Sequence, residues 1–395
     1  MIQRTLQPYA VALAQRHPIV TLTGPRQSGK TTLCCMAFPD KPYVSLEPLD
    51  ERDFARGDPR GFLDRFRDGA VIDEVQRAPE LLSYIQGVVD QRRDVGIFIL
   101  TGSHNFGLLQ AVTQTLAGRT ALLQLLPLGL EEVRHFPTAP RDLFQTLWMG
   151  GYPRIHDRQL PADEWLANYS AAYVERDVRQ LLQVGDLLTF QTFLRLAAGR
   201  TGQLLNLSGL GADCGVTHNT AKSWLSVLEA SYIAFRLPPL HRNLGLRFVK
   251  TPKLHFYDSG LLCYLLGIRT PEQLEVHPLR GAVFETWAVA EILKQYLHHG
   301  QVPQLFFYRD RKGHEVDLIV ERGREMLALE IKSGRTPSAD YFSALEHFAN
   351  VMTDTKKSGV AGITKLVLYG GEASQKRSQG RLLSWSDIAT FPWVQ

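Results

Sequence analysis

The feature that most constrains the fold of this chain is an eight-residue loop, Gly24–Thr31. Its sequence, GPRQSGKT, fits the pattern G-x-x-x-x-G-K-(S/T) and lies between an apolar run, Pro18–Thr23, and a helical stretch. Glycines let backbone N–H groups curl around phosphates, and the helix N-terminus adds the positive end of its dipole. The pattern therefore predicts an α/β fold whose parallel sheet carries an ATP site. The predicted nucleotide-binding residues are Gly24, Pro25, Arg26, Gln27, Ser28, Gly29, Lys30, Thr31 and Thr32.

The second half of this site is an apolar strand that ends in two acids, Asp73 and Glu74. Lys30 is expected to reach the β- and γ-phosphates, while the Thr31 hydroxyl and, through water, Asp73 bind Mg²⁺. Glu74 is expected to polarise the attacking water, because a metal-bound triphosphate still needs an oriented nucleophile. The alternative for Asp73 is a residue that only caps the next helix.

Short apolar runs alternate with helical stretches through the first part of the chain, which is typical of a parallel sheet flanked by helices. Residues at the end of the fourth run, Thr101 and Ser103, are expected beside the third strand, where either could sense the γ-phosphate; a plain turn is the alternative. The five predicted strands are Pro18–Thr23, Tyr43–Leu46, Gly69–Asp73, Ile97–Thr101 and Ala121–Leu125.

Arg119 lies just before the fifth strand. This position suits an arginine donated to the γ-phosphate of a neighbouring subunit, where it would stabilise transition-state charge. A surface arginine without that role is the alternative.

Several segments together resemble a large, mostly bacterial and archaeal family of AAA-type P-loop ATPases. In the region Thr23–Leu128 the matching segments are TGPRQSGKTT, YVSLE, VIDEVQRAPEL, ILTGSHNF and LAGRTALLQLLPL. Further matches are GGYP at 150–153, YVERDV at 173–178, KLHFYDSGLLCYLLG at 253–267 and FETWAVAEIL at 284–293. The resemblance implies an ATPase joined to a winged helix and to a fold similar to PD-(D/E)xK nucleases. It also implies a homo-oligomeric ring, which would give Arg119 its partner.

We expect four parts along the chain. They are an AAA-type ATPase core at 1–150, a helical lid or linker at 151–185, a winged helix-turn-helix at 186–270 and a PD-(D/E)xK nuclease-like domain at 275–395.

The spacing of three helical stretches predicts the helix-turn-helix. Phe190–Ala198 and Leu207–Cys214 precede a turn at Gly215, and Val216–Ala230 follows with Thr217 as its N-cap. On the last helix His218, Asn219, Lys222 and Ser223 are expected to point outward, as residues that meet phosphates and base edges do. Tyr232–Leu237 and Arg247–Val249 are the predicted wing. A protein–protein or lid module is the alternative to DNA binding.

Three acids and a lysine form a second constellation near the C-terminus. Glu285 lies in a predicted helix, Gly281–His299, Asp317 follows a hairpin turn, and Glu330 and Lys332 share one face of a strand. Carboxylates and a lysine at one sheet end can bind Mg²⁺ and activate water for phosphodiester cleavage. The arrangement resembles the PD-(D/E)xK nuclease core, with Val316 in place of the proline. It predicts metal binding by Asp317 and Glu330 and catalytic roles for all four residues; a nuclease fold that only holds DNA or partners is the alternative.

Composition narrows the class of protein. The net charge of +4 is compatible with nucleic acid but does not argue for it alone. No apolar run approaches the roughly 20 residues that span a bilayer, and the first eight residues carry no apolar signal region. The four cysteines lack CxxC spacing, which favours buried thiols in a reducing cytosol over a metal site. We therefore expect a cytoplasmic protein without membrane contact.

The leading hypothesis is a Mg²⁺-dependent ATPase that acts on DNA through the winged helix and the nuclease-like domain. The second is a nucleotide-dependent switch in a protein assembly, with a catalytically silent nuclease-like fold. The third is a metal-dependent nuclease that the ATPase only gates.

Overall fold

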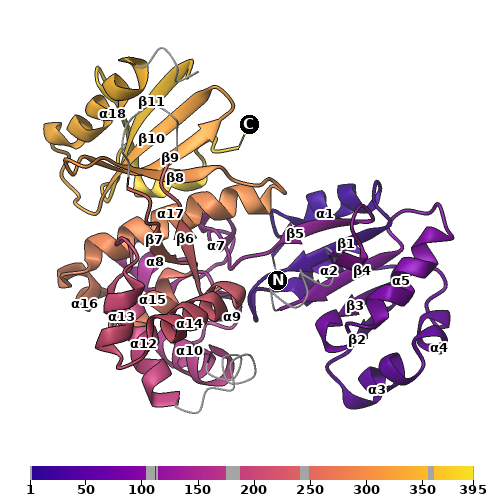
Figure 1. Ribbon diagram of the computed structural model, residues 1–395. Coiled ribbons are helices and arrows are strands. Elements are labelled where there is room, and N and C mark those ends of the chain that lie inside the picture. The colour runs from indigo at the N-terminus through magenta and orange to yellow at the C-terminus, as the bar shows by residue number, and fades with distance from the viewer. Residues whose placement is uncertain are drawn as a thin grey trace. The chain divides into compact units, whose positions relative to one another are not determined.

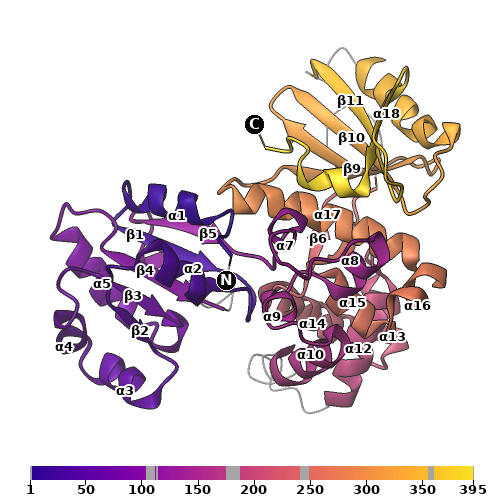
Figure 2. The same cartoon turned by 180° about the vertical axis from the view of Figure 1, so that it is seen from behind.

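The computed structural model describes residues 2–103, 112, 114–174, 187–240, 249–354 and 360–394. The chain divides into two compact units (Figures 1 and 2). The first unit is Met1–Leu128 with two short returns of the chain, Ala230–Tyr232 and Tyr296–Gln301. The second unit contains the remainder.

A five-stranded sheet forms the centre of the first unit. All its strands are parallel, in the order β2-β3-β4-β1-β5, so β3 lies beside β4 and β1 lies between β4 and β5. The strands are β1 (Ile19–Thr23), β2 (Tyr43–Ser45), β3 (Ala70–Asp73), β4 (Phe98–Gly102) and β5 (Thr120–Gln124), which confirms the five predicted strands to within one residue at their ends.

Helices cover both faces of this sheet. Successive residues of β1 and β3 belong to different cores: Ile19 and Ile72 join one cluster, Val20 and Val71 the other. This division explains why the strands are continuously apolar, because a parallel sheet is buried on both sides. The helices of the unit are α1 (Gln7–Ala14), α2 (Lys30–Ala37), α3 (Leu49–Gly57), α4 (Pro59–Asp64) and α5 (Leu81–Asp90), with a 3₁₀ turn, η1, at Val75–Arg77.

The second unit begins with short helices and a two-stranded ribbon. Its first helices are α7 (Leu130–Val133), α8 (Leu143–Met149), α9 (Pro153–Asp157) and α10 (Ala162–Tyr169), which continues as a π-helical turn, Ser170–Val174. They are followed by α12 (Leu187–Gly199), α13 (Leu207–Asp213), α14 (His218–Ala230), β6 (Ala234–Leu237), β7 (Lys253–Phe256), α15 (Ser259–Leu265) and α16 (Pro271–Val276).

A six-stranded mixed sheet ends the second unit, in the order β12-β13-β11-β10-β9-β8. Helix α18 covers one face of it through Phe348 and Met352, which pack with Ile319 and Val367 of the sheet. The elements are α17 (Arg280–His298), β8 (Leu305–Arg309), β9 (Glu315–Arg322), β10 (Glu325–Lys332), η3 (Ala339–Phe342), α18 (Ser343–Asp354), β11 (Gly362–Tyr369), β12 (Gln375–Arg377), β13 (Gly380–Ser384) and η4 (Trp385–Ala389).

The predicted wing requires a correction. The described partner of β6 is β7, which the sequence analysis did not predict and which pairs antiparallel with it from Ala234↔Phe256 to Leu237↔Lys253. Of the predicted strand Arg247–Val249 only Val249 is described, and it lies outside the named strands. Strong β pairing there is favoured because Leu254 and Phe256 are buried. Several predicted features lie outside the described residues: Arg247 and residue 248 of that strand, residues 104–106 of ILTGSHNF, residues 175–178 of YVERDV, residues 175–185 of the lid and residue 186.

Within the described ranges, no helix is both long enough and apolar enough to cross a membrane.

Candidate functional site

Two glycines set the shape of the phosphate loop. Gly24 has φ of 150°, and a Cβ built on it would lie 2.0 Å from the Leu125 carbonyl oxygen. Gly29, the N-cap of α2, has φ of 93° in the left-handed region that other residues avoid. Both positions of the motif therefore require glycine, as the sequence pattern predicts.

Lys30 closes the loop on itself. Its Nζ donates to the carbonyl oxygens of Gly24, at 3.1 Å, and Pro25, at 2.8 Å. Burial lowers the pKa of Lys30 to about 8, an effect that the nearby Glu74 and Asp73 carboxylates partly offset. The ammonium thus has acceptors that a phosphate oxygen could replace.

Asp73 gathers three hydroxyl groups. Thr31 Oγ1 and Tyr43 Oη donate to its Oδ2 at 2.7 and 2.8 Å, and Thr101 Oγ1 donates to its Oδ1. The order of the sheet explains this convergence, because the ends of parallel β2, β3 and β4 meet at one edge next to the start of α2. The structure therefore joins the predicted ligands Thr31 and Asp73 and adds Tyr43.

Glu74 follows in an unusual backbone conformation. Its φ is 58° and its ψ 42°, a left-handed geometry that costs free energy in a residue with a Cβ. Ser103 Oγ donates to Glu74 Oε2 at 3.0 Å, and Gln76 Nε2 donates to the same oxygen. Ser103 thus touches the proposed water-activating residue, as its predicted place beside the third strand implies. Gln76 is a residue that sequence reasoning missed.

Arg4 fixes the backbone of the phosphate loop by hydrogen bonds. Its guanidinium donates to the backbone oxygens of Ser28, at 2.7 Å, and Leu126, at 2.9 Å, and the residue is buried. Ser28 Oγ is itself buried and has no hydrogen-bond partner among the described residues. An orphaned hydroxyl in a glycine loop, together with the oxygen ligands Thr31 and Asp73, fits a phosphate and a hard divalent cation.

Arg119 makes its contacts away from these residues. Its guanidinium forms a two-bond ion pair with Asp90 of α5, with Nη2 to Oδ2 at 2.9 Å, and about a third of its side chain is exposed. Within one chain, therefore, Arg119 faces α5.

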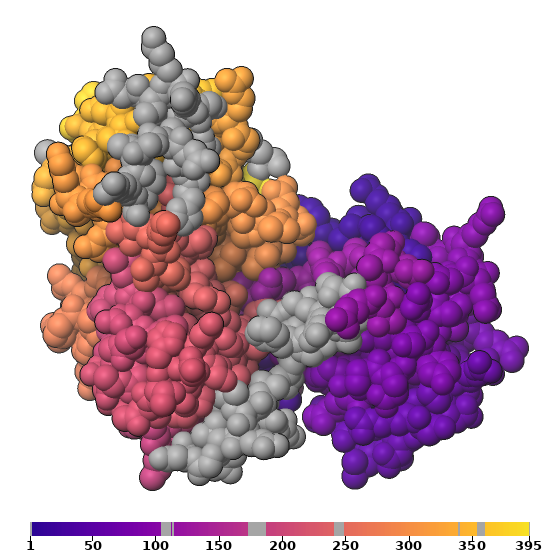
Figure 3. All heavy atoms as spheres, in the orientation of Figure 1, coloured from indigo at the N-terminus to yellow at the C-terminus, as the bar shows by residue number. Residues whose placement is uncertain are grey.

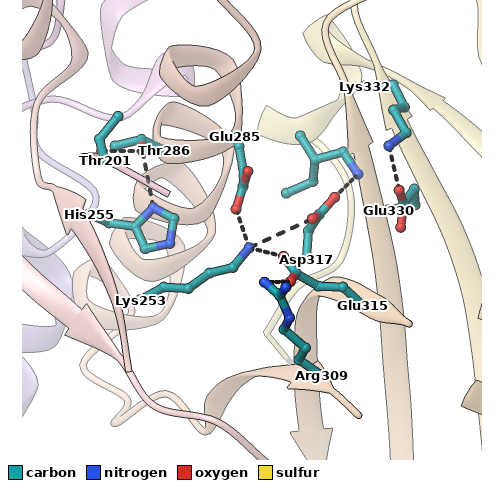
Figure 4. Close-up of polar contacts among 11 residues, drawn as sticks. Thr201, Lys253, His255, Glu285, Thr286, Arg309, Glu315, Asp317, Glu330 and Lys332 are labelled. Atoms are coloured by element: carbon teal, nitrogen blue, oxygen red, sulfur yellow. Dashed lines mark hydrogen bonds and ion pairs between the residues drawn. The ribbon is translucent and has the colours of Figure 1, made fainter. Parts of the chain in front are cut away.

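The C-terminal acids meet around a lysine that sequence reasoning missed (Figure 4). Lys253 of β7 is 2% exposed, and its Nζ lies 2.8 Å from Glu285, 2.5 Å from Glu315 and 3.9 Å from Asp317. Burial alone would lower its pKa, but the three carboxylates outweigh burial and raise it. Glu285 and Asp317 are thus brought together, as predicted, but with an ammonium between them.

Glu330 and Lys332 lie beside this group. Lys332 Nζ is 2.6 Å from Glu330 Oε1, while Glu330 Oε2 is buried without a hydrogen-bond partner among the described residues. Asp317 Oδ2 accepts from the Ile331 backbone N–H at 2.8 Å, which fixes it against β10. The unpaired Glu330 oxygen is an acceptor that fits a cation.

Burial and mutual repulsion shift the pKa values of these acids. Burial first, and then the charge of Asp317, raise the pKa of Glu285 to about 8 and that of Glu330 to about 7, against the attraction of the lysines. Burial also raises the pKa of Asp317. These acids therefore hold protons at a higher pH than exposed carboxyl groups do. The sequence could not reveal this shift in pKa, because the shift depends on burial.

Helix α14 exposes the residues that were predicted to point outward. His218, Asn219, Lys222 and Ser223 are exposed, whereas Ala221, Trp224, Leu225 and Leu228 are buried. Thr217 Oγ1 accepts from the Thr220 N–H at 3.1 Å, which confirms the predicted N-cap. In Figure 3 the segment from α12 to α14, coloured pink, presents a broad surface to the viewer.

Comparison with known proteins divides the chain into three matches. Residues 16–134 match an AAA domain, residues 140–272 a domain of unknown function (DUF8612) and residues 280–388 another domain of unknown function (DUF4143). The uncharacterized proteins Rv2008c of Mycobacterium tuberculosis and Mb2031c of Mycobacterium bovis are each 31% identical over 327 residues, which is 82% of this chain and 72% of theirs. A solved Walker-type ATPase of Pyrococcus abyssi is 14% identical and has a TM-score of 0.45, over 66% of this chain and 94% of that chain.

Proposed function

The chain belongs to the family of the uncharacterized mycobacterial proteins Rv2008c and Mb2031c, and from that premise we propose that it is a Mg²⁺-dependent ATPase that acts on DNA. The observation that carries the ATPase is the contact between Thr31 and Asp73 at the mouth of a glycine loop. It joins a hydroxyl from the loop to a carboxylate from a neighbouring strand, which is the ligand pair that P-loop ATPases use for Mg²⁺.

The roles of the residues follow from their contacts. Lys30 would exchange the two loop carbonyls for β- and γ-phosphate oxygens, and Thr31 and, through water, Asp73 would hold Mg²⁺, which would neutralise phosphate charge. Glu74 accepts a proton from water, oriented by Ser103 and Gln76. Arg119 would complete the site of the next subunit in a homo-oligomeric ring, released from Asp90.

The central test is ATP turnover by the full chain, measured with and without single-stranded, duplex and branched DNA. We expect Mg²⁺-dependent turnover that DNA stimulates and that Lys30→Ala abolishes, with Lys365→Ala, a lysine of β11, as the matched control. Turnover that survives Lys30→Ala would remove the ATPase proposal. Turnover that no DNA changes, together with no binding at low salt, would remove the DNA part.

The proposed DNA contact is the exposed face of α14. His218, Asn219 and Lys222 lie on its first turns, and the capped N-terminus of the helix adds a positive dipole end. With α12, α13 and the β6–β7 ribbon, this helix would form the winged helix-turn-helix.

A second candidate, a nucleotide-dependent switch with a catalytically silent nuclease-like fold, is favoured by Lys253. Its ammonium lies 2.8 Å from Glu285 and 3.9 Å from Asp317, so a positive charge already lies beside one of the two proposed metal ligands. In an active nuclease, Asp317 and Glu330 would hold the metal while Glu285 and Lys332 assist.

Plasmid nicking with Mg²⁺ or Mn²⁺ separates the two candidates. Nicking that Asp317→Ala abolishes and Lys30→Ala leaves intact would make the C-terminal domain a nuclease. No nicking by the wild type, with DNA-independent ATP turnover, favours the switch. We propose a cytoplasmic location under either candidate.

A further inference from the structure

A further cluster of titratable side chains lies at the turn of the β8–β9 hairpin, directly before Glu315 in the sequence. Asp310 and His314 come from the hairpin turn and His347 from α18. One ligand atom from each lies within 4.8 Å of the other two. Neither the proposed ATPase site nor the acid group uses these residues.

One carboxylate oxygen is the focus of the cluster. Asp310 Oδ2 lies 2.8 Å from His314 Nδ1 and 3.2 Å from His347 Nε2. Four ligands around Zn²⁺, at bonds of about 2.0–2.1 Å, are separated from one another by about 3.3 Å. Both distances from Asp310 to the imidazoles are within about 0.5 Å of this separation, and the two ring nitrogens lie within 4.8 Å of each other.

The other oxygen of Asp310 is fixed by the backbone. Oδ1 accepts from the N–H groups of Lys312, at 2.8 Å, and His314, at 3.0 Å. The carboxylate is thus held in one orientation, with Oδ2 turned to the two imidazoles.

The two rings come from elements that the core holds together. His314 and His347 stack with centroids 3.9 Å apart and planes inclined by 25°. Next to them, Phe348 of α18 packs edge-on against Tyr308 of β8, with centroids 4.9 Å apart. Such packing fixes the helix against the hairpin and leaves the imidazoles at the surface, where an ion can enter.

We propose that Asp310, His314 and His347 bind a divalent transition-metal ion of the Zn²⁺ class. His314 Nδ1, His347 Nε2 and Asp310 Oδ2 are the ligands, and water takes the fourth position. Each ring presents a lone pair in place of the N–H that now faces Asp310, so its proton moves to the other ring nitrogen or to solvent. The bound ion links α18 to the hairpin that carries Glu315 and Asp317.

The test is titration of the full chain after a chelator has removed any bound metal. Binding of Zn²⁺, added alone, is measured by calorimetry. Binding of Co²⁺ is measured in a second titration by visible absorption. We expect one ion per chain. Since outer partners of a metal are already worth about 10- to 100-fold in affinity, the loss of a direct ligand in Asp310→Asn or His347→Gln should weaken binding by about 100-fold or more. His135→Gln, at an exposed histidine of another segment, should bind as the wild type does.

Two results would overturn the proposal. One is a stripped wild-type chain that takes up no ion at one equivalent and gives no Co²⁺ absorption beyond that of the free ion. The other is equal affinity in the wild type, Asp310→Asn and His347→Gln. Asp310→Asn replaces only one oxygen atom with an NH₂ group, so the variant should fold as the wild type does. Thermal unfolding of its metal-free form checks this. These outcomes are independent of ATP turnover, so they do not depend on the proposed ATPase.

Discussion

In the nucleotide site, the adjacent acids Asp73 and Glu74 differ in their hydrogen-bond partners. Three hydroxyls converge on the Asp73 carboxylate, while Ser103 and Gln76 hold one oxygen of Glu74. The two adjacent acids therefore have different partners: Asp73 sits among groups suited to an ion, and Glu74 among groups that orient a carboxylate. This difference supports the proposal that the first binds the metal ion and the second accepts the proton.

Glu74→Gln should separate ATP binding from hydrolysis. The amide keeps the size of the side chain but cannot accept a proton, so turnover should fall by about 100- to 10,000-fold while ATP affinity changes little. Steady-state phosphate release and nucleotide titration measure the two effects. Glu131→Gln, at an exposed residue of α7, is the control; loss of ATP affinity in Glu74→Gln would contradict the assigned role.

The raised pKa values of the C-terminal acids predict a dependence of stability on pH. Glu285 binds a proton up to about pH 8 when folded but only to about 4.5 when unfolded, so the folded state holds more protons between these values. Stability should therefore fall as pH rises, by roughly 1–3 kcal/mol over this window. The window from pH 6.5 to 8 is the cleanest, because His255, whose buried neutral ring has its pKa lowered to about 3, acts in the opposite direction only below 6.5.

Thermal unfolding across pH 6.5 to 8 tests this dependence. Glu285→Gln should flatten the decline, since the amide does not titrate. An equally steep decline in Glu285→Gln would assign it to other groups.

At the scale of elements, α14 depends on its first turn. Gly215, with φ of 70°, ends the preceding turn, and Thr217 caps the helix through the Thr220 N–H. The apolar side of the helix is anchored by Trp224, which packs edge-on against Phe190 and Phe193 of α12. The polar side is therefore presented in a fixed orientation.

Lys222→Glu should weaken DNA binding by the full chain. A reversed charge on the exposed face replaces attraction to phosphate with repulsion, so affinity should fall by about tenfold or more at low salt, with a shallower salt dependence. Fluorescence anisotropy at several salt concentrations measures both quantities. Arg93→Glu, the same charge reversal at an exposed residue of the first unit, is the control; unchanged binding in Lys222→Glu would exclude this face.

Thr217→Ala tests the cap without changing charge. Loss of the hydroxyl acceptor should destabilise the helix by about 1 kcal/mol, and a lower melting temperature of the second unit would report it. No change in melting would mean that the cap contributes nothing to stability.

At the scale of the whole molecule, the contacts of Arg119 bear on whether several copies of the chain act together. Inside one chain the guanidinium pairs with Asp90, which is an exposed ion pair worth little by itself. The proposed role in hydrolysis would be played at the site of a second copy of the chain.

Arg119→Ala should lower turnover by about 1,000-fold while ATP affinity stays unchanged, if the arginine acts in trans. Asp90→Asn breaks the same ion pair but keeps the arginine, so it should retain turnover. Turnover per chain in the wild type should also rise with protein concentration. If the two variants change turnover equally, Arg119 is a surface residue without a role in hydrolysis.

The sequence determined the local structure of the molecule. The glycine loop, the five parallel strands and the cap at Thr217 follow from patterns of adjacent residues, because backbone conformation and burial period are local properties. The sequence likewise predicted that Asp317 and Glu330 meet at one sheet end, and Asp317 accepts from the backbone N–H of Ile331, beside Glu330.

Only the tertiary structure decided which polar and charged groups that are distant in the sequence lie in contact. Lys253 lies 32 residues before Glu285 in the chain and in a segment with no acidic pattern of its own, yet its ammonium lies within 4 Å of three carboxyl groups. Arg4 beneath the phosphate loop, Gln76 beside Glu74 and His347 facing Asp310 are further examples. A buried charge is stable only where opposite charges or hydrogen bonds surround it, and those neighbours are set by how strands and helices pack, which no local pattern records.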